Sequence, residues 1–331
     1  MKPIVGITIG DFNGVGPEVA LKAIAQPGVR QLCQPVLIGP MAVFTDVARS
    51  LKIKVKLEKS TLSAYKASVI PVVDVGDGIA ADVTYGSPTK SGGKNAGIAI
   101  ERAVELCLQK KIHAMATAPT SKEALNLAGY SFPGQTEMVT LFSRSQHVAM
   151  MLVSPSMRVG LVTAHAPLQG VAPQMSQEKV IEKIQVVYQA CQVDFAVKRP
   201  KLAVLALNPH AGEHGLIGSE EDAILAPAIA SSKRDGMDVS GPFPADAFFG
   251  KRLDKKFDAI LAMYHDQGLI PLKMSSFGKG VNYSAGLSIV RTSPDHGTAY
   301  DIAGKRKAKP SSMVEAIKLA VAIVKNRSKH D

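Results

Sequence analysis

The sequence has few of the features that mark secreted or membrane-spanning proteins. Only three cysteines occur in 331 residues, and they stand far apart without a CxxC pair, so we expect no disulfide framework. No apolar run approaches the roughly 18 residues that a transmembrane helix needs. The opening stretch MKPIVGITIGDF soon becomes polar and glycine-rich, which favours a first strand over a signal peptide. These absences predict a cytoplasmic protein that does not enter a membrane.

Aromatic residues are also scarce, at 5% of the chain, although the formal net charge is +11. A basic balance can serve nucleic acid, an anionic membrane or an acidic small substrate. Here the lysines are dispersed, and aromatic side chains that could stack on bases are not interleaved with them. We therefore expect a solvated basic surface, no nucleic-acid partner and no membrane partner.

Short β-type runs alternate with longer helical runs along most of the chain. Examples are PIVGITIG before PEVALKAIAQ, RVGLVTAH before SQEKVIEKIQVVYQACQ, and LAVLALNPH before EEDAILAPAIASSKRDG. Such alternation implies βα units and a largely parallel sheet. The length is more than one core comfortably supports and favours two domains. The predicted fold class is α/β.

Three of the eight histidines follow the ends of predicted strands. His165 ends GLVTAH, His210 ends VLALNPH, and His265 ends ILAMYH. Ligands bind beyond the carboxyl ends of strands in open α/β sheets, and three imidazoles with an open position are typical of catalytic zinc sites. A lone strand-end histidine commonly has a structural role, but three in one topological position predict a shared metal site. We expect zinc, with manganese, cobalt or magnesium as alternatives.

Two other stretches carry groups suited to an anion. Lys273, Asn282 and Arg291 share a glycine-rich segment, where they predict an anion clamp or, alternatively, three ordinary polar residues on a long loop. After the first strand, GDFNGVGPEV offers Gly14, Gly16 and a helix N-terminus to an anion. Its spacing is not that of the dinucleotide fingerprint, so a tight structural turn is the alternative.

Several motifs, taken in order, resemble the 4-hydroxythreonine-4-phosphate dehydrogenase family of vitamin B6 biosynthesis. They are GDFNGVGPEV, PGQTEM, TAHAPL, LNPHAGEHG, FPADAFF, YHDQGLIPLK and VNYSAGLSIVRTSPDHGTAYDIAG. GDFNGVGPEV and HGTAYDIAGK are more distantly similar to segments of isocitrate and isopropylmalate dehydrogenases. The matching motifs run in order from residue 6 to residue 304.

The resemblance implies two α/β/α domains with a cleft between them, as in the isocitrate and isopropylmalate dehydrogenases. By analogy, residues 1–129 and 271–331 form a first domain on the cofactor side. Residues 130–270 form a second domain that carries the metal site and the dimer interface. The resemblance also implies a homodimer whose metal site draws on both subunits.

The same resemblance implies a reaction and assigns residues to it. The expected reaction is metal-dependent, NAD-linked oxidation and decarboxylation of 4-phosphohydroxy-L-threonine to 3-amino-2-oxopropyl phosphate, a step towards pyridoxal phosphate. The matching positions are His165, His210 and His265 for the metal, and Thr136, Lys273, Asn282 and Arg291 for the substrate.

One position departs from the family pattern. Where the family usually has histidine before threonine, this chain has Gln135 before Thr136. We expect Gln135 to bind the substrate through hydrogen bonds, although an amide cannot be protonated as an imidazole can. The change leaves open a paralogous dehydrogenase of a four-carbon phosphorylated sugar acid, such as 4-phospho-erythronate or 4-phospho-threonate.

Proton transfer and cofactor choice can be assigned as hypotheses. Asp246 in FPADAFF is our candidate for proton transfer near the metal, with Lys273 as the other. In the related hydroxyacid dehydrogenases, an aspartate at the position of Asp301 faces the adenosine ribose, which favours NAD over NADP. His296 is expected near the adenine. NADP is the alternative cofactor, and a helix cap is the alternative role for Asp301.

A function of another class is also compatible with the charge. A basic, non-catalytic protein that binds phosphate or nucleic acid would not need three strand-end histidines. Its affinity for DNA would fall steeply with salt concentration. Bound metal therefore distinguishes this alternative from the enzyme.

Overall fold

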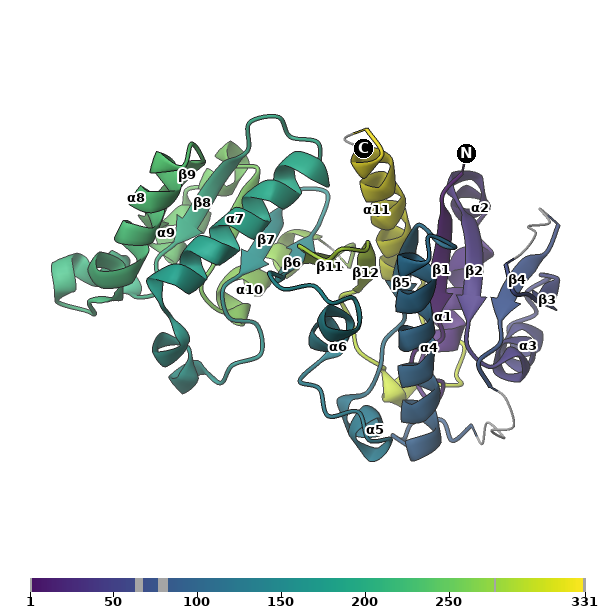
Figure 1. Ribbon diagram of the computed structural model, residues 1–331. Coiled ribbons are helices and arrows are strands. Elements are labelled where there is room, and N and C mark those ends of the chain that lie inside the picture. The colour runs from purple at the N-terminus through teal and green to yellow at the C-terminus, as the bar shows by residue number, and fades with distance from the viewer. Residues whose placement is uncertain (1, 63–67, 77–82, 277, 330–331) are drawn as a thin grey trace. The chain divides into compact units, whose positions relative to one another are not determined.

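The computed structural model describes residues 2–62, 68–76, 83–276 and 278–329. The chain divides into two compact units (Figure 1). Unit 1 comprises Met1–Ser145 and Leu287–Lys325, and unit 2 comprises Gln146–Gly286 and Asn326–Asp331. Each unit contains both strands and helices, so the predicted α/β class is confirmed.

Unit 1 contains a parallel sheet in the order β3-β4-β2-β1-β5-β12. Its strands are β1 (Ile4–Thr8), β2 (Gln34–Ile38), β3 (Leu57–Lys59), β4 (Ile70–Val73), β5 (Ala114–Thr117) and β12 (Arg291–Pro294). Its helices are α1 (Gly16–Ile24), α2 (Pro27–Leu32), α3 (Met41–Ser50), α4 (Lys90–Leu108), α5 (Lys122–Leu127), α6 (Gln135–Phe142), α11 (Ser311–Arg327) and the 3-10 turn η6 (Tyr300–Ile302). The central strands are apolar on both faces, as expected for a parallel sheet covered by helices.

Unit 2 contains a mixed sheet in the order β11-β6-β7-β10-β8-β9. Its strands are β6 (Ala149–Val153), β7 (Arg158–Leu161), β8 (Lys201–Leu205), β9 (Asp238–Phe243), β10 (Ala259–Ala262) and β11 (Val281–Ala285). β7, β10, β8 and β9 are parallel, whereas β6 runs antiparallel to both of its neighbours. The parallel group therefore has its four carboxyl ends at one edge of the sheet.

Helices cover both faces of the unit 2 sheet. They are α7 (Gln177–Val193), α8 (Ala226–Arg234), α9 (Ala245–Gly250) and α10 (His265–Ser276), with short turns η1 (Leu168–Gly170), η2 (Ala172–Gln174), η3 (Pro209–Gly215), η4 (Glu221–Leu225) and η5 (Leu253–Lys256). A Cβ on Gly160 would meet Val187 of α7 at 2.5 Å, and a Cβ on Gly268 of α10 would meet Val159 at 2.5 Å. Since Val159 and Gly160 are consecutive in β7, α7 and α10 pack on opposite faces.

The unit boundaries differ from the expected ones at 129/130 and 270/271. Residues 130–145 belong to unit 1, where the Gln135 side chain bonds the backbone oxygen of Ala118 at 3.2 Å. Residues 271–286 belong to unit 2, because β11 pairs with β6 there. Hydrogen bonding of side chains and strand register therefore decide where each unit begins.

The C-terminal residues are held in unit 2 by a buried carboxylate. Asp194 accepts a hydrogen bond from the Tyr283 hydroxyl and another from Arg327 Nε at 2.6 Å. Burial raises the pKa of Tyr283 well above its usual value, which keeps the hydroxyl a donor. The expected assignment of this end to the first domain therefore differs from the structure.

The structure bears on two features that the sequence was expected to lack, disulfides and a transmembrane helix. Cys33, Cys107 and Cys191 are free and buried, and burial raises the pKa of the latter two thiols to about 12. Among the helices of the described residues, none combines the length and the apolar character that crossing a bilayer requires.

Candidate active site

Unit 2 brings the three predicted metal-binding histidines to one edge of its sheet. β7, β10 and β8 are adjacent and parallel, and His165, His265 and His210 follow their respective carboxyl ends. The rings of His165 and His265 lie with their centroids 6.5 Å apart. His165 and His210 are exposed, and the His265 side chain is 41% exposed. The imidazoles are therefore available to a ligand.

The donor chemistry at this edge fits a divalent metal ion. His265 Nδ1 lies 2.6 Å from Asp266 Oδ1, so its Nε2 is left to act as a ligand. Metal-binding histidines commonly use the second ring nitrogen in this way. Within the described ranges, no three His, Cys, Asp or Glu side chains of the single chain are close enough to enclose an ion.

A left-handed turn carries His210. The φ angles of His210, Ala211, Glu213 and His214 are 52°, 55°, 45° and 53°, and Gly212 between them has φ 75°. A left-handed helical conformation costs about 1–2 kcal/mol for each residue that has a Cβ. Strain of this kind persists only where surrounding contacts impose it, and it clusters at functional sites.

Glu221 supplies contacts that impose the turn, and sequence reasoning did not single it out. The side chain is 2% exposed, and its Oε1 accepts hydrogen bonds from the backbone nitrogens of Leu207 and Asn208 at 2.8 and 2.7 Å. Its Oε2 accepts from Asn208 Nδ2 at 2.9 Å, and Glu220 Oε2 accepts from the same nitrogen at 2.7 Å. The only sequence signal was the acidic pair in GSEE.

Two further side chains join the strand ends that precede the histidines. Gln267 Oε1 accepts from Met263 N at 2.7 Å, while Gln267 Nε2 donates to Ala206 O at 2.6 Å, which links β10 to β8. Thr163 Oγ1 donates to Met263 O at 2.7 Å, which links β7 to β10. The three histidine-bearing loops thus start from a hydrogen-bonded edge.

The other predicted residues of unit 2 lie at different distances from this edge. Asp246 is exposed in α9, just after β9, the next parallel strand of the same edge. Lys273 is exposed on α10, eight residues after His265, which corresponds to roughly 12 Å along the helix axis. Asn282 lies in β11, and its buried Oδ1 has no hydrogen-bond partner among the described residues. An unsatisfied buried acceptor of this kind is suited to a ligand donor.

Unit 1 builds a second cluster of predicted residues around Arg291. This side chain is 2% exposed, at the start of β12 beside β5. Its Nε donates to Thr117 Oγ1 at 3.1 Å, its Nη1 to Thr136 Oγ1 at 3.4 Å, and its Nη2 to Gln135 Oε1 at 2.8 Å. Burial lowers the pKa of Arg291 to about 10, and the nearby Glu137 carboxylate opposes the shift. A buried guanidinium that side chains hold in a fixed orientation is suited to an anion.

The Gln135 amide is oriented by the same cluster. Its Nε2 donates to Thr120 Oγ1 at 2.7 Å and to Ala118 O at 3.2 Å, so its oxygen faces Arg291. An amide nitrogen has two hydrogens, and both are used here. Gln135 therefore presents only an acceptor to any further group.

The turn after β1 is packed against protein, and its glycines have a structural reason. A Cβ on Gly14 would lie 2.6 Å from Thr298 O, and one on Gly16 would lie 2.3 Å from Ile9 O. The segment that includes Thr298 also carries the predicted cofactor residues His296 and Asp301. His296 is partly exposed and Asp301 is exposed.

Comparison with known proteins identifies the family. The family model described as "Pyridoxal phosphate biosynthetic protein PdxA" matches residues 31–320. The chain belongs to this family. The 4-hydroxythreonine-4-phosphate dehydrogenase of Geobacter metallireducens is 42% identical over 98% of this chain and 96% of its own. The D-threonate 4-phosphate dehydrogenase of Cupriavidus necator is 38% identical over 98% of each chain.

Solved structures of PdxA-family members and of a more distant enzyme share the fold. The crystal structure of 4-hydroxythreonine-4-phosphate dehydrogenase from Klebsiella pneumoniae matches with a TM-score of 0.87 at 35% identity, covering 98% of each chain. Isocitrate dehydrogenase from Methylococcus capsulatus matches with a TM-score of 0.51 at 11% identity, covering 99% of this chain and 87% of that one. The family resemblance and the fold class predicted from the motifs are confirmed.

Replacing Glu221 tests whether its carboxylate imposes the histidine turn. Glu221→Ala leaves two backbone N–H groups without their acceptor, so we expect the free energy of unfolding to fall by about 3 kcal/mol. Urea denaturation measures the change. Glu220→Ala is the control and should cost under about 1 kcal/mol, because among the described residues that side chain bonds the Asn208 amide alone. Equal effects of the two variants would contradict the assignment.

Proposed function

We propose that this chain catalyses metal-dependent, NAD-linked oxidation and decarboxylation of 4-hydroxythreonine 4-phosphate to 3-amino-2-oxopropyl phosphate. The convergence of His165, His210 and His265 on one sheet edge is the observation that carries the proposal. Family membership and the names of the relatives support the substrate. The product serves pyridoxal phosphate biosynthesis, and the three buried free cysteines suit a reducing cytoplasm.

The three histidines are the proposed metal ligands. Zinc is the expected ion, with manganese, cobalt or magnesium as alternatives, because imidazole accepts several of these metals. A divalent ion at this edge would supply Lewis acidity, which polarises the substrate hydroxyl and the ketone that replaces it. Exposed imidazoles at converging strand ends support this assignment.

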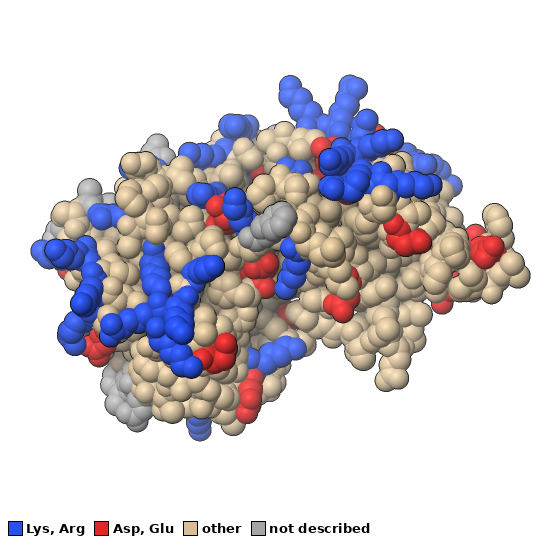
Figure 2. All heavy atoms as spheres, turned by 180° about the vertical axis from the view of Figure 1, so that it is seen from behind, with Lys and Arg blue, Asp and Glu red and all other residues tan. Residues whose placement is uncertain are grey.

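Arg291, Thr136 and Gln135 in unit 1, with Lys273 and Asn282 in unit 2, are the proposed substrate ligands. Arg291 supplies a fixed cation for phosphate or carboxylate, and Lys273 supplies a second charge on an exposed helix face. Figure 2 shows many Lys and Arg side chains on the face drawn, with fewer Asp and Glu side chains scattered among them. Such a surface suits a small anionic substrate without requiring a nucleic-acid or membrane partner.

The oxidation requires a hydride acceptor and a proton acceptor. Bound NAD⁺ would supply the acceptor for the hydride of C3, and a base would take the proton of the 3-hydroxyl. Asp246 is the proposed base, with Lys273 as the alternative. The exposed Asp246 follows β9, next to the strand that precedes His210, which supports this choice.

The cofactor is proposed to be NAD, with NADP as the alternative. The exposed carboxylate of Asp301 suits the ribose 2′-hydroxyl and would repel a 2′-phosphate. His296 is the proposed neighbour of the adenine, and Gly14 and Gly16 belong to the turn that supports this segment.

A homodimer is proposed because the histidine-bearing segments of unit 2 expose apolar side chains. Leu168 is 74% exposed three residues after His165, and Leu216 is 83% exposed six residues after His210. Ile270 and Met274, 57% and 74% exposed, are one turn apart on α10. Exposed apolar side chains gathered around a functional edge mark an interaction surface. A second subunit seated there would complete the metal site.

A phosphorylated sugar acid is the second candidate substrate. The Cupriavidus necator relative is named for D-threonate 4-phosphate, which differs from 4-hydroxythreonine 4-phosphate by a hydroxyl in place of the amino group. The Gln135 amide presents only an acceptor, and a hydroxyl can donate to it as an ammonium can.

Reduction of NAD⁺ with each substrate tests the proposed reaction. Metal-reconstituted protein should form NADH with 4-hydroxythreonine 4-phosphate at a higher kcat/KM than with D-threonate 4-phosphate. NADP⁺ should be a poorer acceptor than NAD⁺. A preference for D-threonate 4-phosphate would select the second candidate, and inactivity on both would contradict the proposed reaction.

Metal content of two histidine variants tests the ligand assignment. His210→Ala should lose stoichiometric metal after gel filtration, because it removes a proposed ligand. His214→Ala is the matched control, since the residue has the same left-handed conformation and is also exposed. It should retain the metal. Equal metal content in the two variants would exclude His210 as a ligand, and a wild-type protein without metal would favour the non-catalytic binding protein.

Asp246→Asn separates proton transfer from metal binding. The variant should keep its metal and lose at least ~100-fold in turnover, the usual scale for a general base. Unchanged turnover would remove Asp246 from the reaction.

Sedimentation velocity tests the proposed dimer. Met274→Glu should shift the protein towards monomer, because an unpaired carboxylate would be buried in the interface. Leu127→Glu, at a residue 52% exposed in unit 1, is the control and should leave the association unchanged. A monomeric wild type, or a Met274→Glu variant that associates normally, would contradict the proposal.

A further inference from the structure

The segment that carries His296 and Asp301 lies directly on the turn after β1. Val15 N donates to Thr298 O at 2.9 Å, and a Cβ on Gly14 would collide with that same oxygen. The two stretches are therefore in backbone contact, although they lie at opposite ends of the sequence.

A buried carboxylate forms the side-chain link between them. Asp11 is 0% exposed, and its Oδ2 accepts a hydrogen bond from the Tyr300 hydroxyl at 2.5 Å. Its Oδ1 accepts from Asn13 N at 2.9 Å. Burial raises the pKa of Asp11, while the hydrogen bonds from Tyr300 and Asn13 oppose that shift. A hydroxyl bound to a carboxylate in a buried setting is a strong hydrogen bond.

The Asp11 carboxylate is itself held in place by the rest of unit 1. Asp11 N donates to Pro119 O at 2.8 Å, after the end of β5. Asn13 Nδ2 donates to Thr89 Oγ1 at 2.8 Å, and Asn13 Oδ1 accepts from Thr84 N at 2.7 Å. The loop that carries the acceptor for Tyr300 is therefore also held by contacts outside the 296–301 segment.

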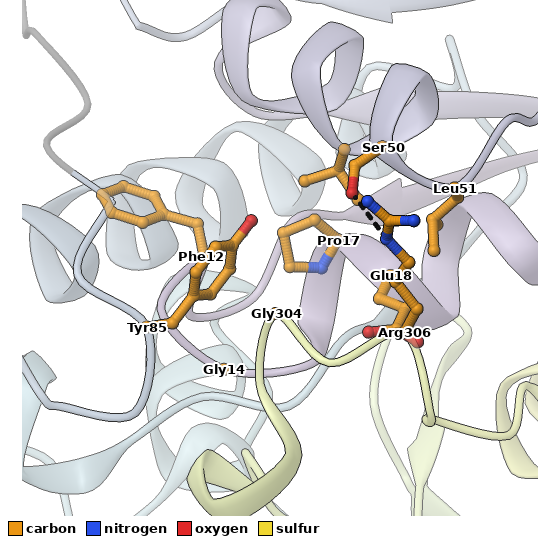
Figure 3. Close-up of a pocket in the computed structure, with 10 residues that line it drawn as sticks. Phe12, Gly14, Pro17, Glu18, Ser50, Leu51, Tyr85, Gly304 and Arg306 are labelled. Carbon is orange, nitrogen blue, oxygen red and sulfur yellow. Dashed lines mark hydrogen bonds between the residues drawn. The ribbon is translucent and has the colours of Figure 1, made fainter.

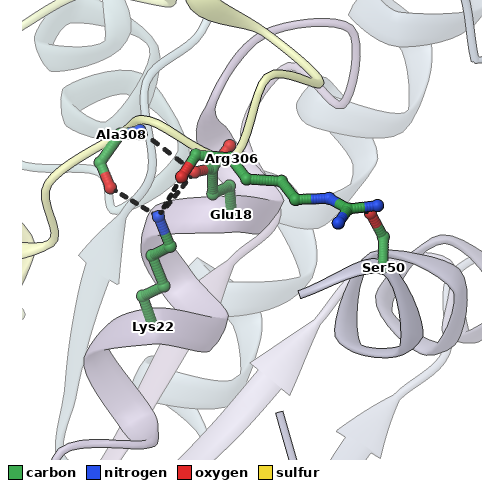
Figure 4. A network of polar contacts seen from close by, with 5 residues as sticks. All are labelled: Glu18, Lys22, Ser50, Arg306 and Ala308. Carbon is green, nitrogen blue, oxygen red and sulfur yellow. Dashed lines mark hydrogen bonds and ion pairs between the residues drawn. The ribbon is translucent and has the colours of Figure 1, made fainter. Parts of the chain in front are cut away.

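A second attachment holds the segment farther along the chain. Lys22 Nζ donates to Arg306 O at 2.9 Å and to Ala308 O at 2.8 Å, and it pairs with Glu18 Oε1 at 2.7 Å (Figure 4). Glu18 Oε1 also accepts from Ala308 N at 3.0 Å. Glu18 and Lys22 both lie in α1, so these hydrogen bonds join the helix to the segment.

A small pocket beside α1 separates this second attachment from the turn after β1. Figure 3 shows Gly304 and Tyr85 on one side of it, with Arg306 and Ser50 on the other. Arg306 Nε donates to Ser50 Oγ at 3.1 Å, which joins the segment to α3 as well. Asp301 lies between the two attachments and remains exposed.

We propose that the Asp11–Tyr300 hydrogen bond positions the 296–301 segment for the dinucleotide. Tyr300 and Asp301 are consecutive, with the first directed into the protein and the second towards solvent. Fixing Tyr300 therefore fixes the backbone from which Asp301 reaches the ribose. Asp11 and Tyr300 are positioning residues, and their role rests on the proposed NAD-linked function.

Direct binding of NADH to Tyr300→Phe tests the proposal. The variant removes one hydroxyl and leaves the Lys22 attachment in place, so the segment loses order without losing its contacts to α1. We expect the dissociation constant for NADH, measured by calorimetry, to rise about 10-fold, as for the loss of a hydrogen bond to a charged group. In kinetics the KM for NAD⁺ should rise while kcat and the KM of the phosphorylated substrate stay within about twofold.

Two further variants complete the experiment. Tyr188→Phe is the matched control, because it removes a hydroxyl that accepts from Asp238 N in unit 2. It should bind NADH as the wild type does. Asp11→Asn keeps an acceptor without the charge and should weaken NADH binding less than Tyr300→Phe. If Tyr300→Phe does not fold, Asp11→Asn alone must still weaken NADH binding for the proposal to stand.

The outcomes separate this inference from the proposed function. A folded Tyr300→Phe variant with wild-type affinity for NADH would overturn the positioning role and leave the dehydrogenase proposal intact. A wild-type protein that binds neither NADH nor NADPH would overturn both.

Discussion

The parallel pairing of β7, β10, β8 and β9 is the constraint on which the candidate site depends. In parallel strands all carboxyl ends lie at one edge, so residues that follow different strands meet there although they are far apart in sequence. His165, His265, His210 and the carboxylate in α9 each follow one of these four ends. The chemistry of the edge is thus a consequence of strand order.

The histidine-bearing edge of unit 2 includes an unfavourable backbone conformation, and nearby hydrogen bonds stabilise it. His210 stands in a left-handed turn that most residues avoid, and the buried Glu221 carboxylate supplies the hydrogen bonds that hold its start. Exposed leucine, isoleucine and methionine side chains flank the same loops. In the proposed dimer, a second subunit would remove this apolar surface from water and complete the proposed metal site.

In unit 1 the charged group of the candidate site is buried, in contrast to the open histidine edge of unit 2. Arg291 is fully enclosed, and threonine and glutamine side chains orient it. Burial lowers the pKa of Arg291 to about 10, which still leaves it cationic near neutral pH. The amide of Gln135 provides an acceptor that does not titrate. The cation of unit 1 is therefore enclosed and held in a fixed orientation, whereas the histidine edge of unit 2 is open.

The sequence could predict where the strands end better than it could predict the side-chain contacts that hold those strand ends in place. The positions of the three histidines after strand ends could be predicted, because each histidine follows a buried apolar run that stops abruptly. The family motifs also located Arg291 and Thr136. The left-handed turn at His210 was not predictable, since Ala211 and Glu213 within it are residue types that rarely adopt positive φ. Nor was the Asp11–Tyr300 bond, whose partners are 289 positions apart in the sequence.

X-ray absorption at the zinc edge of the zinc-reconstituted protein tests the central claim most directly. The account predicts three imidazole nitrogens at about 2.0–2.1 Å and an oxygen in the remaining position. A first shell made of oxygens alone, or one with a sulfur ligand, would contradict the assignment of the histidine edge as the metal site.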